Sequence, residues 1–362
     1  MRIAVIAHLR HPIASPFKGG MEAHCHALVT ALQAARHNVT LFASGDSDPA
    51  LPIVAATPIH YEAVLPWAHW HGTPELTAFQ ERAFASAWNG VLEGGFDIVH
   101  NNAMHPSLHQ WAVRDHIPMV TSLHVPPFNG LADAIGANAA SWLRQTVTSN
   151  AHAATWWPTL PASASVVHNG IDTARWPFKA SGNGRALWCG RLTPTKGTAV
   201  AIEAARAAGV ALDIVGPIDC QTYFDEEVAP LLGDDYVYRG LMSGDALAQA
   251  MAAASVLIAT PMWDEPFGLV AAEAMACGVP VAALDRGAMR EVVGEAGAIA
   301  ASPADLPAAI RIAMTVDRAA CRERVERLFS IRQMIAGYEE AYSWAIAGLP
   351  ASSAASTRAL LA

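Results

Sequence analysis

The sequence predicts an α/β protein with two halves, each built on a doubly wound parallel sheet of the Rossmann type. Three observations lead to this class. The chain has 362 residues, enough for two domains of about 100–200 residues each. Apolar runs of strand length alternate with stretches of helical periodicity, which favours parallel sheets covered by helices. The strand, loop and helix at the start of the chain are followed, from Arg185, by a second series of the same kind.

The first half begins with residues 2–7 (RIAVIA), which predict a buried strand. A loop with the glycines of KGG follows, and helical spacing from Met21 to Ala35 leads into the strand VTLFAS. FDIVH at 96–100 and MVTSLH at 119–124 predict two more strands, each after a helical stretch.

In the second half, ALWCG predicts a strand, RLTPTKG a loop, TAVAIEAARAAG a helix and VALDIVG the next strand. Further strands are expected at 235–239 and in SVLIAT and VPVAAL. Helices are expected at 244–253 and at about 267–277.

The periodicity is interrupted at 160–184, where two prolines and the polar run KASGNGR occur. We therefore expect an N-terminal domain over 1–165 and a C-terminal domain over 166–330. A helix at about 331–346 is expected to pack back on the first domain. Two doubly wound domains that face a cleft would hold a ligand at the carboxyl ends of their strands.

Composition and charge exclude several classes of function. The formal net charge is −9 and no segment gathers Lys and Arg, which argues against nucleic acid or anionic lipid as a partner. The five cysteines form no C-x-x-C pair, as expected for reduced, buried thiols. No signal peptide or apolar run of membrane-spanning length is recognised, so we expect a soluble, cytoplasmic protein.

The segment CGRLTPTKG follows a strand and opens a helix, which places Arg191 and Lys196 beside backbone N–H groups at a helix N-terminus. The helix dipole, the amides and two cations all favour negative charge, so the segment predicts a diphosphate site. Taken alone, it is also compatible with two solvated charges on a loop.

The stretch WDEPFGLVAAEAMACG contains Glu265 and Glu273 but no lysine or arginine. Glu265 is expected in a loop, and Glu273 about 12 Å along the following helix at about 1.5 Å per residue. Ionised carboxylates accept hydrogen bonds from vicinal hydroxyls, so each could bind a sugar at one end of a diphosphate. The expected partners of the glutamates are therefore ligand hydroxyls together with the helix N-terminus. The amides of Phe267, Gly268 and Leu269 are expected to stabilise the anion between the two glutamates. The alternatives are a helix-start acid and a solvent-facing helix glutamate.

Together, HNGID (168–172), GRLTPTKG (190–197) and WDEPFGLVAAEAMACGVPV (263–281) resemble the family 4 retaining glycosyltransferases of the GT-B fold, with their E-x7-E motif. KGGMEAH resembles the family's first Gly-rich loop. The resemblance implies two Rossmann-like domains facing a central cleft and a nucleotide-diphosphate sugar as donor. It also implies transfer without a metal or another cofactor.

The resemblance also assigns roles to residues. Arg191 and Lys196 would bind the donor diphosphate and stabilise it as the leaving group. Glu265 would contact the donor sugar, and Glu273 the ribose.

Three residues of the first half also match the family. Gly19 and Gly20 would let the backbone approach the donor phosphate and the acceptor, although a plain turn is the alternative. His124 would lie near the transferred sugar, although a histidine at a strand end is often structural.

The chain departs from the family where many members carry a glycine pair, because it has Arg286 and Gly287 there. Asn102 stands where some relatives have a second histidine. Both differences affect the acceptor side, so the acceptor is left unidentified, as a small molecule or a glycan.

Two other motifs give weaker indications of function. Asp46 and Asp48 form a D-x-D sequence, which we interpret as a loop rather than a metal site because it lies in a Ser/Gly/Pro-rich turn. LPWAHWHG places Trp67, His69, Trp70 and His71 in a loop, where the tryptophans could stack on sugar rings or fill the core.

The leading hypothesis is a hexosyltransferase that uses UDP-glucose, since the chain resembles bacterial members that glucosylate small soluble acceptors such as pterins. A nucleotide-sugar epimerase and a non-catalytic nucleotide-sugar-binding protein are the alternatives. A dinucleotide-dependent dehydrogenase is excluded because no G-x-G-x-x-G follows the first strand.

Overall fold

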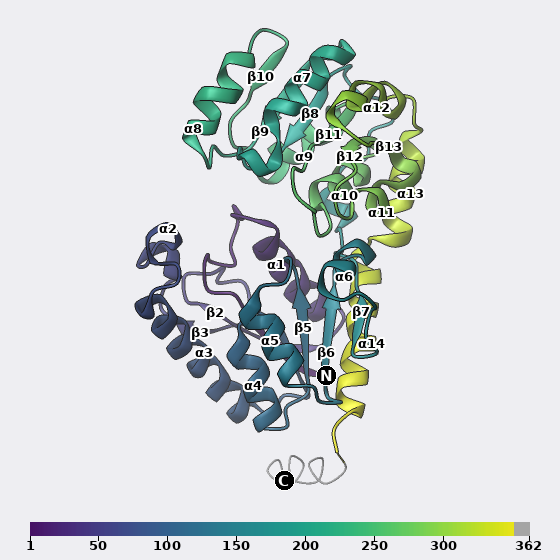
Figure 1. Cartoon of the computed structure of the whole chain (residues 1–362). Helices are drawn as coiled ribbons and strands as arrows, with labels where there is room; N and C mark the ends of the chain where they lie inside the picture. The colour runs from purple at the N-terminus through teal and green to yellow at the C-terminus, as the bar shows by residue number, and fades with distance from the viewer. Residues whose placement is uncertain (351–362) are drawn as a thin grey trace. The chain divides into compact units, whose positions relative to one another are not determined.

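The computed structural model describes residues 1–350, which form two compact units. The first unit comprises Met1–Thr148, Ala153–Val167 and the C-terminal segment from Met334. The second comprises Ser149–His152 and His168–Gln333. Helices surround a parallel sheet in each unit (Figure 1). The predicted α/β class is therefore confirmed.

The first unit has a seven-stranded parallel sheet in the order β3-β2-β1-β4-β5-β6-β7. Its strands are β1 (Arg2–Ala7), β2 (Asn38–Ser44), β3 (Ile53–Thr57), β4 (Ile98–Asn102), β5 (Met119–Leu123), β6 (Leu143–Val147) and β7 (Ala164–Val166). The helices along this part of the chain are α1 (Gly20–Ala34), α2 (Trp67–Trp70), α3 (Pro74–Gly94), α4 (Pro106–Arg114), α5 (Asn129–Ala137) and α6 (Asn150–Trp156).

The second unit has a six-stranded parallel sheet in the order β10-β9-β8-β11-β12-β13. Its strands are β8 (Ala186–Cys189), β9 (Leu212–Val215), β10 (Tyr236–Tyr238), β11 (Val256–Ala259), β12 (Val281–Leu284) and β13 (Gly297–Ala300). The helices are α7 (Thr198–Ala208), α8 (Gln221–Tyr223), α9 (Gly244–Ala253), α10 (Leu269–Ala276), α11 (Met289–Val293), α12 (Leu306–Ala313), α13 (Arg318–Leu328) and α14 (Ile331–Ala347), the last of which continues into the first unit.

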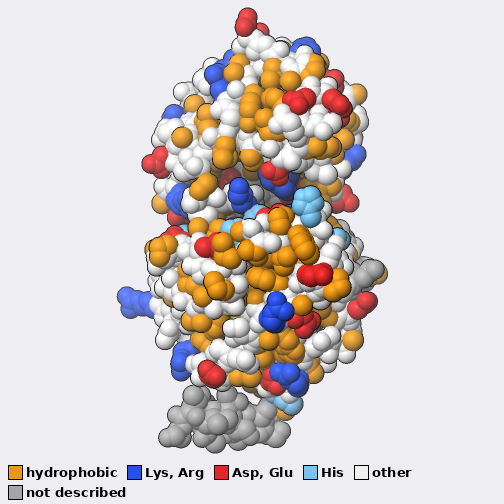
Figure 2. All heavy atoms as spheres, turned by 90° about the vertical axis from the view of Figure 1, so that its left-hand side faces the viewer, with side chains coloured by type: hydrophobic (Ala, Val, Ile, Leu, Met, Phe, Trp, Pro, Cys, Tyr) orange, Lys and Arg blue, Asp and Glu red, His pale blue; other side chains and the backbone are white. Residues whose placement is uncertain are grey.

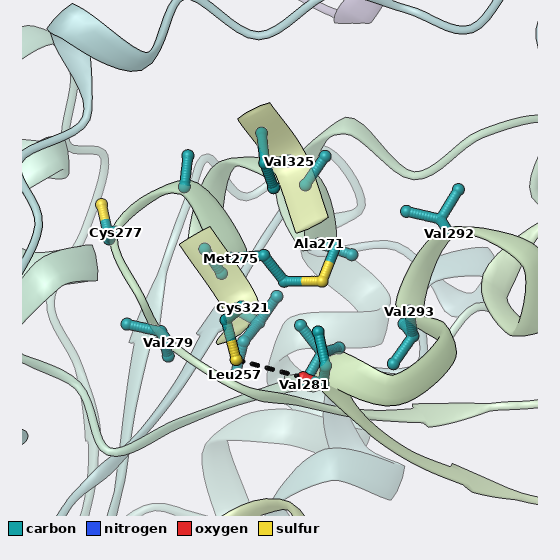
Figure 3. Packing of buried hydrophobic residues seen from close by; sticks show 14 of the residues in the cluster. Leu257, Ala271, Met275, Cys277, Val279, Val281, Val292, Val293, Cys321 and Val325 are labelled. Atoms are coloured by element: carbon teal, nitrogen blue, oxygen red, sulfur yellow. Dashed lines mark hydrogen bonds between the residues drawn. The ribbon is translucent and has the colours of Figure 1, made fainter. Parts of the chain in front are cut away.

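Both sheets lie inside their units, as expected for parallel strands covered by helices on both faces. All four residues of β12 are buried. Figure 3 shows Leu257 and Val281 from the sheet packed with Met275 of α10 and Val325 of α13. Small side chains, above all alanine, allow these helices to lie close to the strands.

The face drawn in Figure 2 carries charged side chains of both signs. On the face in Figure 2, Lys and Arg side chains alternate with Asp and Glu among hydrophobic side chains on both units. None of the helices within residues 1–350 is long and apolar enough to cross a membrane.

Three strands of the first unit were not predicted from the sequence. β3 is at the sheet edge with Val54 and Ala55 exposed, and its short apolar run IVAAT was not identified as a strand. β6 is buried but contains Gln145 and Thr146, whose polar side chains hide the strand pattern. β7 has only three residues.

Candidate functional site

The candidate site of the second unit lies where the order of its strands reverses. β8 pairs with β9 on one side and with β11 on the other, so the chain proceeds in opposite directions from the centre of the sheet. The loops that follow β8 and β11 both leave from the carboxyl edge at this point. Open α/β sheets bind ligands at such a position.

The loop after β8 has a defined shape because it is fastened to the loop after β11. Thr260 Oγ1 donates to the carbonyl oxygens of Lys196 and Gly197 at 3.0 and 2.9 Å, and accepts from Trp188 Nε1 at 3.0 Å. Gly197 has φ +66°, and a Cβ there would lie 2.4 Å from the Thr260 carbonyl oxygen. Only glycine fits this turn, which directs Lys196 towards the β11 loop.

Lys196 and Glu265 form an ion pair at the site. Lys196 Nζ lies 2.6 Å from Glu265 Oε2, and Trp263 Nε1 donates to the same oxygen at 3.1 Å. The two charged side chains are 27% and 16% exposed. The expectation that neither glutamate has a basic partner in the protein is therefore wrong for Glu265. Within residues 1–350, its second oxygen, Oε1, accepts no hydrogen bond.

Arg191 also has an acidic partner, because its Nη1 lies 2.9 Å from Asp219 Oδ2. Asp219 follows β9, the neighbour of β8, and was not singled out from the sequence. Both side chains are well exposed, at 51% and 39%, so this pair contributes little to stability. The Arg191 guanidinium can therefore leave Asp219 and bind an anionic ligand instead.

The N-terminus of α10 is the third part of the site. The helix begins at Leu269, and its N-cap, Gly268, has φ +86° and no side-chain capping bond. The first-turn N–H groups, next to Phe267, therefore have no side-chain acceptor at the cap, and with the helix dipole they favour an anion. The predicted start at about 267 is two residues early because Gly268 adopts the left-handed conformation.

Glu265 is fixed in its loop by the segment before α11. Ala288 N donates to the Glu265 carbonyl oxygen at 2.8 Å. Gly287 has φ +55°, and a Cβ there would lie 2.3 Å from the same oxygen. Gly287, one of the two residues that depart from the family pattern, thus lies against the loop that carries Glu265.

Glu273 projects from α10 among apolar and small residues. Burial raises the pKa of Glu273 to about 7, and the positive charge of Arg175 opposes this rise only in part. No hydrogen-bond donor within residues 1–350 reaches its carboxyl group. A carboxyl group of this kind gains from a ligand that donates hydrogen bonds to it.

The HNGID segment supports the same region. His168 Nε2 lies 2.8 Å from Glu291 Oε1, and its ring lies 6.1 Å from that of Phe267. Burial alone would raise the pKa of Glu291. Hydrogen bonds from His168 and from the backbone N–H groups of Asn150 and Ala151 outweigh burial and lower that pKa. Glu291 is a supporting residue that sequence reasoning missed.

The other predicted site residues belong to the first unit. His124 follows β5, and its Nε2 lies 2.7 Å from Asn102 Oδ1 at the end of β4. Gly19 is the N-cap of α1, which begins at Gly20, and its backbone is extended. A Cβ at Gly19 would lie 3.1 Å from Glu22 Oε2, so the close neighbour of this glycine is the chain's own carboxylate.

The D-x-D carboxylates have separate partners. Asp46 Oδ2 lies 2.5 Å from His60 Nδ1, and Asp48 Oδ2 lies 3.3 Å from His26 Nε2. The Ala50 N–H also donates to Asp48. These contacts are those of a folded turn.

The segment with Trp67, His69, Trp70 and His71 was expected to be a loop, but Trp67–Trp70 form the short helix α2. Trp70 packs against the core of the first unit. Trp67 is 36% exposed, with the Arg10 guanidinium 5.1 Å and the His71 ring 4.3 Å from its own ring. His69 is exposed.

Comparison with known proteins identifies the family to which the chain is similar. The model for Glycosyltransferase Family 4 matches residues 18–175, and that for Glycosyl transferases group 1 matches residues 183–315. A phosphatidyl-myo-inositol mannosyltransferase of Mycolicibacterium smegmatis is 28% identical over 337 residues, covering 84% of this chain and 81% of that protein. A glycogen synthase of Mycobacterium tuberculosis is 27% identical, covering 90% and 88%.

Solved structures show the same fold. The sucrose-phosphate synthase of Thermosynechococcus elongatus superimposes with a TM-score of 0.72 at 22% identity, covering 94% of this chain and 99% of that one. The Anabaena protein HepE in complex with UDP and glucose gives a TM-score of 0.70 at 20% identity, covering 95% and 99%. The chain belongs to the family 4 glycosyltransferases of the GT-B fold and is a transferase.

Proposed function

We propose that this glycosyltransferase moves a hexose, with retention of anomeric configuration, from a nucleotide-diphosphate sugar to an acceptor hydroxyl. The observation that carries the proposal is the arrangement of Lys196, Glu265 and the α10 N-terminus around one point of the second sheet. Cationic and amide donors suit the diphosphate, while the unused Glu265 oxygen suits a sugar hydroxyl.

The donor is proposed to be UDP-glucose. The structural similarity to HepE, which was solved with UDP and glucose, supports this choice. In the proposal, Glu273 accepts hydrogen bonds from the ribose hydroxyls, and Arg191 exchanges Asp219 for the diphosphate. The amides of Phe267, Gly268 and Leu269 serve the same anion.

Transfer is proposed to need no protein nucleophile. The bond between the anomeric carbon and the phosphate oxygen breaks, and the acceptor oxygen bonds to that carbon on the same face. The departing phosphate oxygen takes the acceptor's proton. Arg191 and Lys196 stabilise the charge that develops on the diphosphate, a task that a metal ion performs in other transferases.

The residues of the first unit are proposed to serve the acceptor and the transferred sugar. His124, oriented by Asn102, contacts the sugar, and the loop of Gly19 and Gly20 admits the acceptor. The acceptor is a small molecule or a glycan that offers a hydroxyl group, and small soluble compounds such as pterins are the first to test. A nucleotide-sugar epimerase is not favoured, since both family models describe transferases.

The test is turnover of UDP-glucose labelled at the anomeric carbon, with water and with a panel of hydroxylated acceptors, in EDTA. We expect release of UDP and a product whose anomeric configuration, observed by NMR, equals that of the donor. An inverted product would disprove retention, and activity that appears only with added divalent metal would disprove the metal-independent mechanism.

A further inference from the structure

A chain of buried polar side chains in the first unit leads from α14 to the neighbour of His124. Tyr342 Oη lies 2.6 Å from His100 Nδ1, and His100 Nε2 lies 2.8 Å from Ser122 Oγ. Ser122 Oγ donates to Tyr338 Oη at 3.2 Å, and Tyr338 Oη lies 3.3 Å from His24 Nε2. All of these side chains are at most 4% exposed.

The direction of each hydrogen bond follows from that of Ser122. Since the Ser122 hydroxyl donates to Tyr338, the Tyr338 hydroxyl has its own hydrogen left to donate to His24 Nε2. Ser122 then accepts from His100 Nε2, and His100 Nδ1 accepts from Tyr342. This assignment uses each proton once and gives His24 its proton on Nδ1.

This row of hydrogen-bonded side chains carries no charge over the physiological pH range. Burial lowers the pKa of both His24 and His100 to about 3, and burial raises the pKa of Tyr338 to about 12. Neutral groups in a fixed order of donors and acceptors hold one geometry and do not respond to pH. The arrangement is therefore suited to orienting a neighbour.

That neighbour is His124. The rings of His24 and His124 lie 4.4 Å apart between centroids, at an angle of 57°. Asn102 Oδ1 lies 2.7 Å from His124 Nε2. His124 is thus oriented by a hydrogen bond and by a ring contact, and the contacting ring is itself held by Tyr338.

We infer that Tyr338 and His24 are positioning residues for His124, through which the C-terminal helix α14 orients a side chain of the acceptor and sugar side. The inference rests on the proposed function for the role of His124. Tyr338 contacts His24 directly, through a hydrogen bond and a ring contact. Tyr342 instead hydrogen-bonds to His100 and stacks on Tyr338, with 6.3 Å between the ring centroids.

The experiment compares Tyr338→Phe with Tyr342→Phe, a matched control that removes one buried hydroxyl from the same chain. The ring Cε1–H and Cδ2–H signals of His124 are recorded by NMR and assigned through their absence in His124→Gln. We expect a clear shift in Tyr338→Phe and a much smaller one in Tyr342→Phe, because the Tyr338 hydroxyl is the one that bonds to His24. Turnover of UDP-glucose should fall about 10- to 100-fold in kcat for Tyr338→Phe, because misplacement by about 1 Å of a side chain that positions the transferred sugar has such effects. KM for the donor should be unchanged.

Unshifted His124 signals in Tyr338→Phe, or equal shifts in both variants, would overturn the inference. If Tyr338→Phe does not fold, His24→Gln keeps an acceptor for Tyr338 and removes the ring, and the same signals decide. The proposed function fails separately: normal turnover by His124→Gln would remove the role of His124 even where the signals respond to Tyr338.

Discussion

Replacing Glu273 with glutamine tests whether a carboxyl group of high pKa lies in the second unit. In the unfolded chain, this carboxyl group loses its proton near its usual pKa of 4.5, whereas burial raises the folded-state pKa to about 7. Between these values the folded state binds more protons than the unfolded state. The contribution of Glu273 to the free energy of unfolding is therefore greatest below pH 4.5 and falls as pH rises to about 7.

The magnitude follows from the two pKa values. At about 1.36 kcal/mol for each pH unit, a rise from 4.5 to about 7 corresponds to at most about 3 kcal/mol lost above neutral pH. Part of the side chain is accessible to solvent, so this value is an upper bound. Glutamine has the shape of the protonated acid and no charge to desolvate.

The assay is the melting temperature of wild type and Glu273→Gln between pH 4.5 and 8.5. We expect similar values at pH 4.5 and a variant that is more stable by several degrees at pH 8. Glu203→Gln, which changes an exposed glutamate of α7, is the control and should follow wild type at every pH. Parallel curves for wild type and Glu273→Gln would refute the raised pKa.

Gly287→Ala should destabilise the protein by about 1–3 kcal/mol in urea unfolding, because φ is +55° and the new Cβ would lie 2.3 Å from the Glu265 carbonyl oxygen. Gly233→Ala, where the Cβ meets no atom within 4 Å, should have much less effect, and equal losses would contradict this account of Gly287. Thr260→Val should cost about 1–3 kcal/mol by the same measurement, since it leaves the buried Trp188 N–H unpaired and frees the turn that carries Lys196. An unchanged urea midpoint would show that this hydroxyl does not fasten the turn.

Much of the second unit could be predicted because its signals are local. Arg191 and Lys196 lie in one loop between a strand and a helix, and Glu265 and Glu273 lie at a fixed spacing in one segment. Such motifs can be recognised without knowing how the rest of the chain folds.

The ion pair of Lys196 with Glu265 was not predicted because it joins residues 69 positions apart. It exists only because β8 and β11 are neighbours at the centre of the sheet, which no local pattern states. The contact of Asp219 with Arg191 was not predicted for the same reason, because it depends on the pairing of β9 with β8.

The polar interior of the first unit has a similar explanation. A strand such as β6, with Gln145 and Thr146, has little apolar character and so gives no strand signal. Its polar groups are buried because other strands and helices supply their partners. Ser122 of β5 and Thr146, for example, lie 3.1 Å apart. Only the assembled sheet reveals such pairings.

The most direct test of the donor site is the thermal stability of the protein with UDP, GDP, ADP and their sugars, in EDTA. A donor that binds only the folded state adds about 2.7 kcal/mol at a hundred times its dissociation constant. We predict stabilisation by one nucleotide family, UDP and UDP-glucose, that is lost in Lys196→Ala and kept in Arg206→Ala, a control at the far end of α7. Absence of a shift with every nucleotide, or a full shift in Lys196→Ala, would contradict the site.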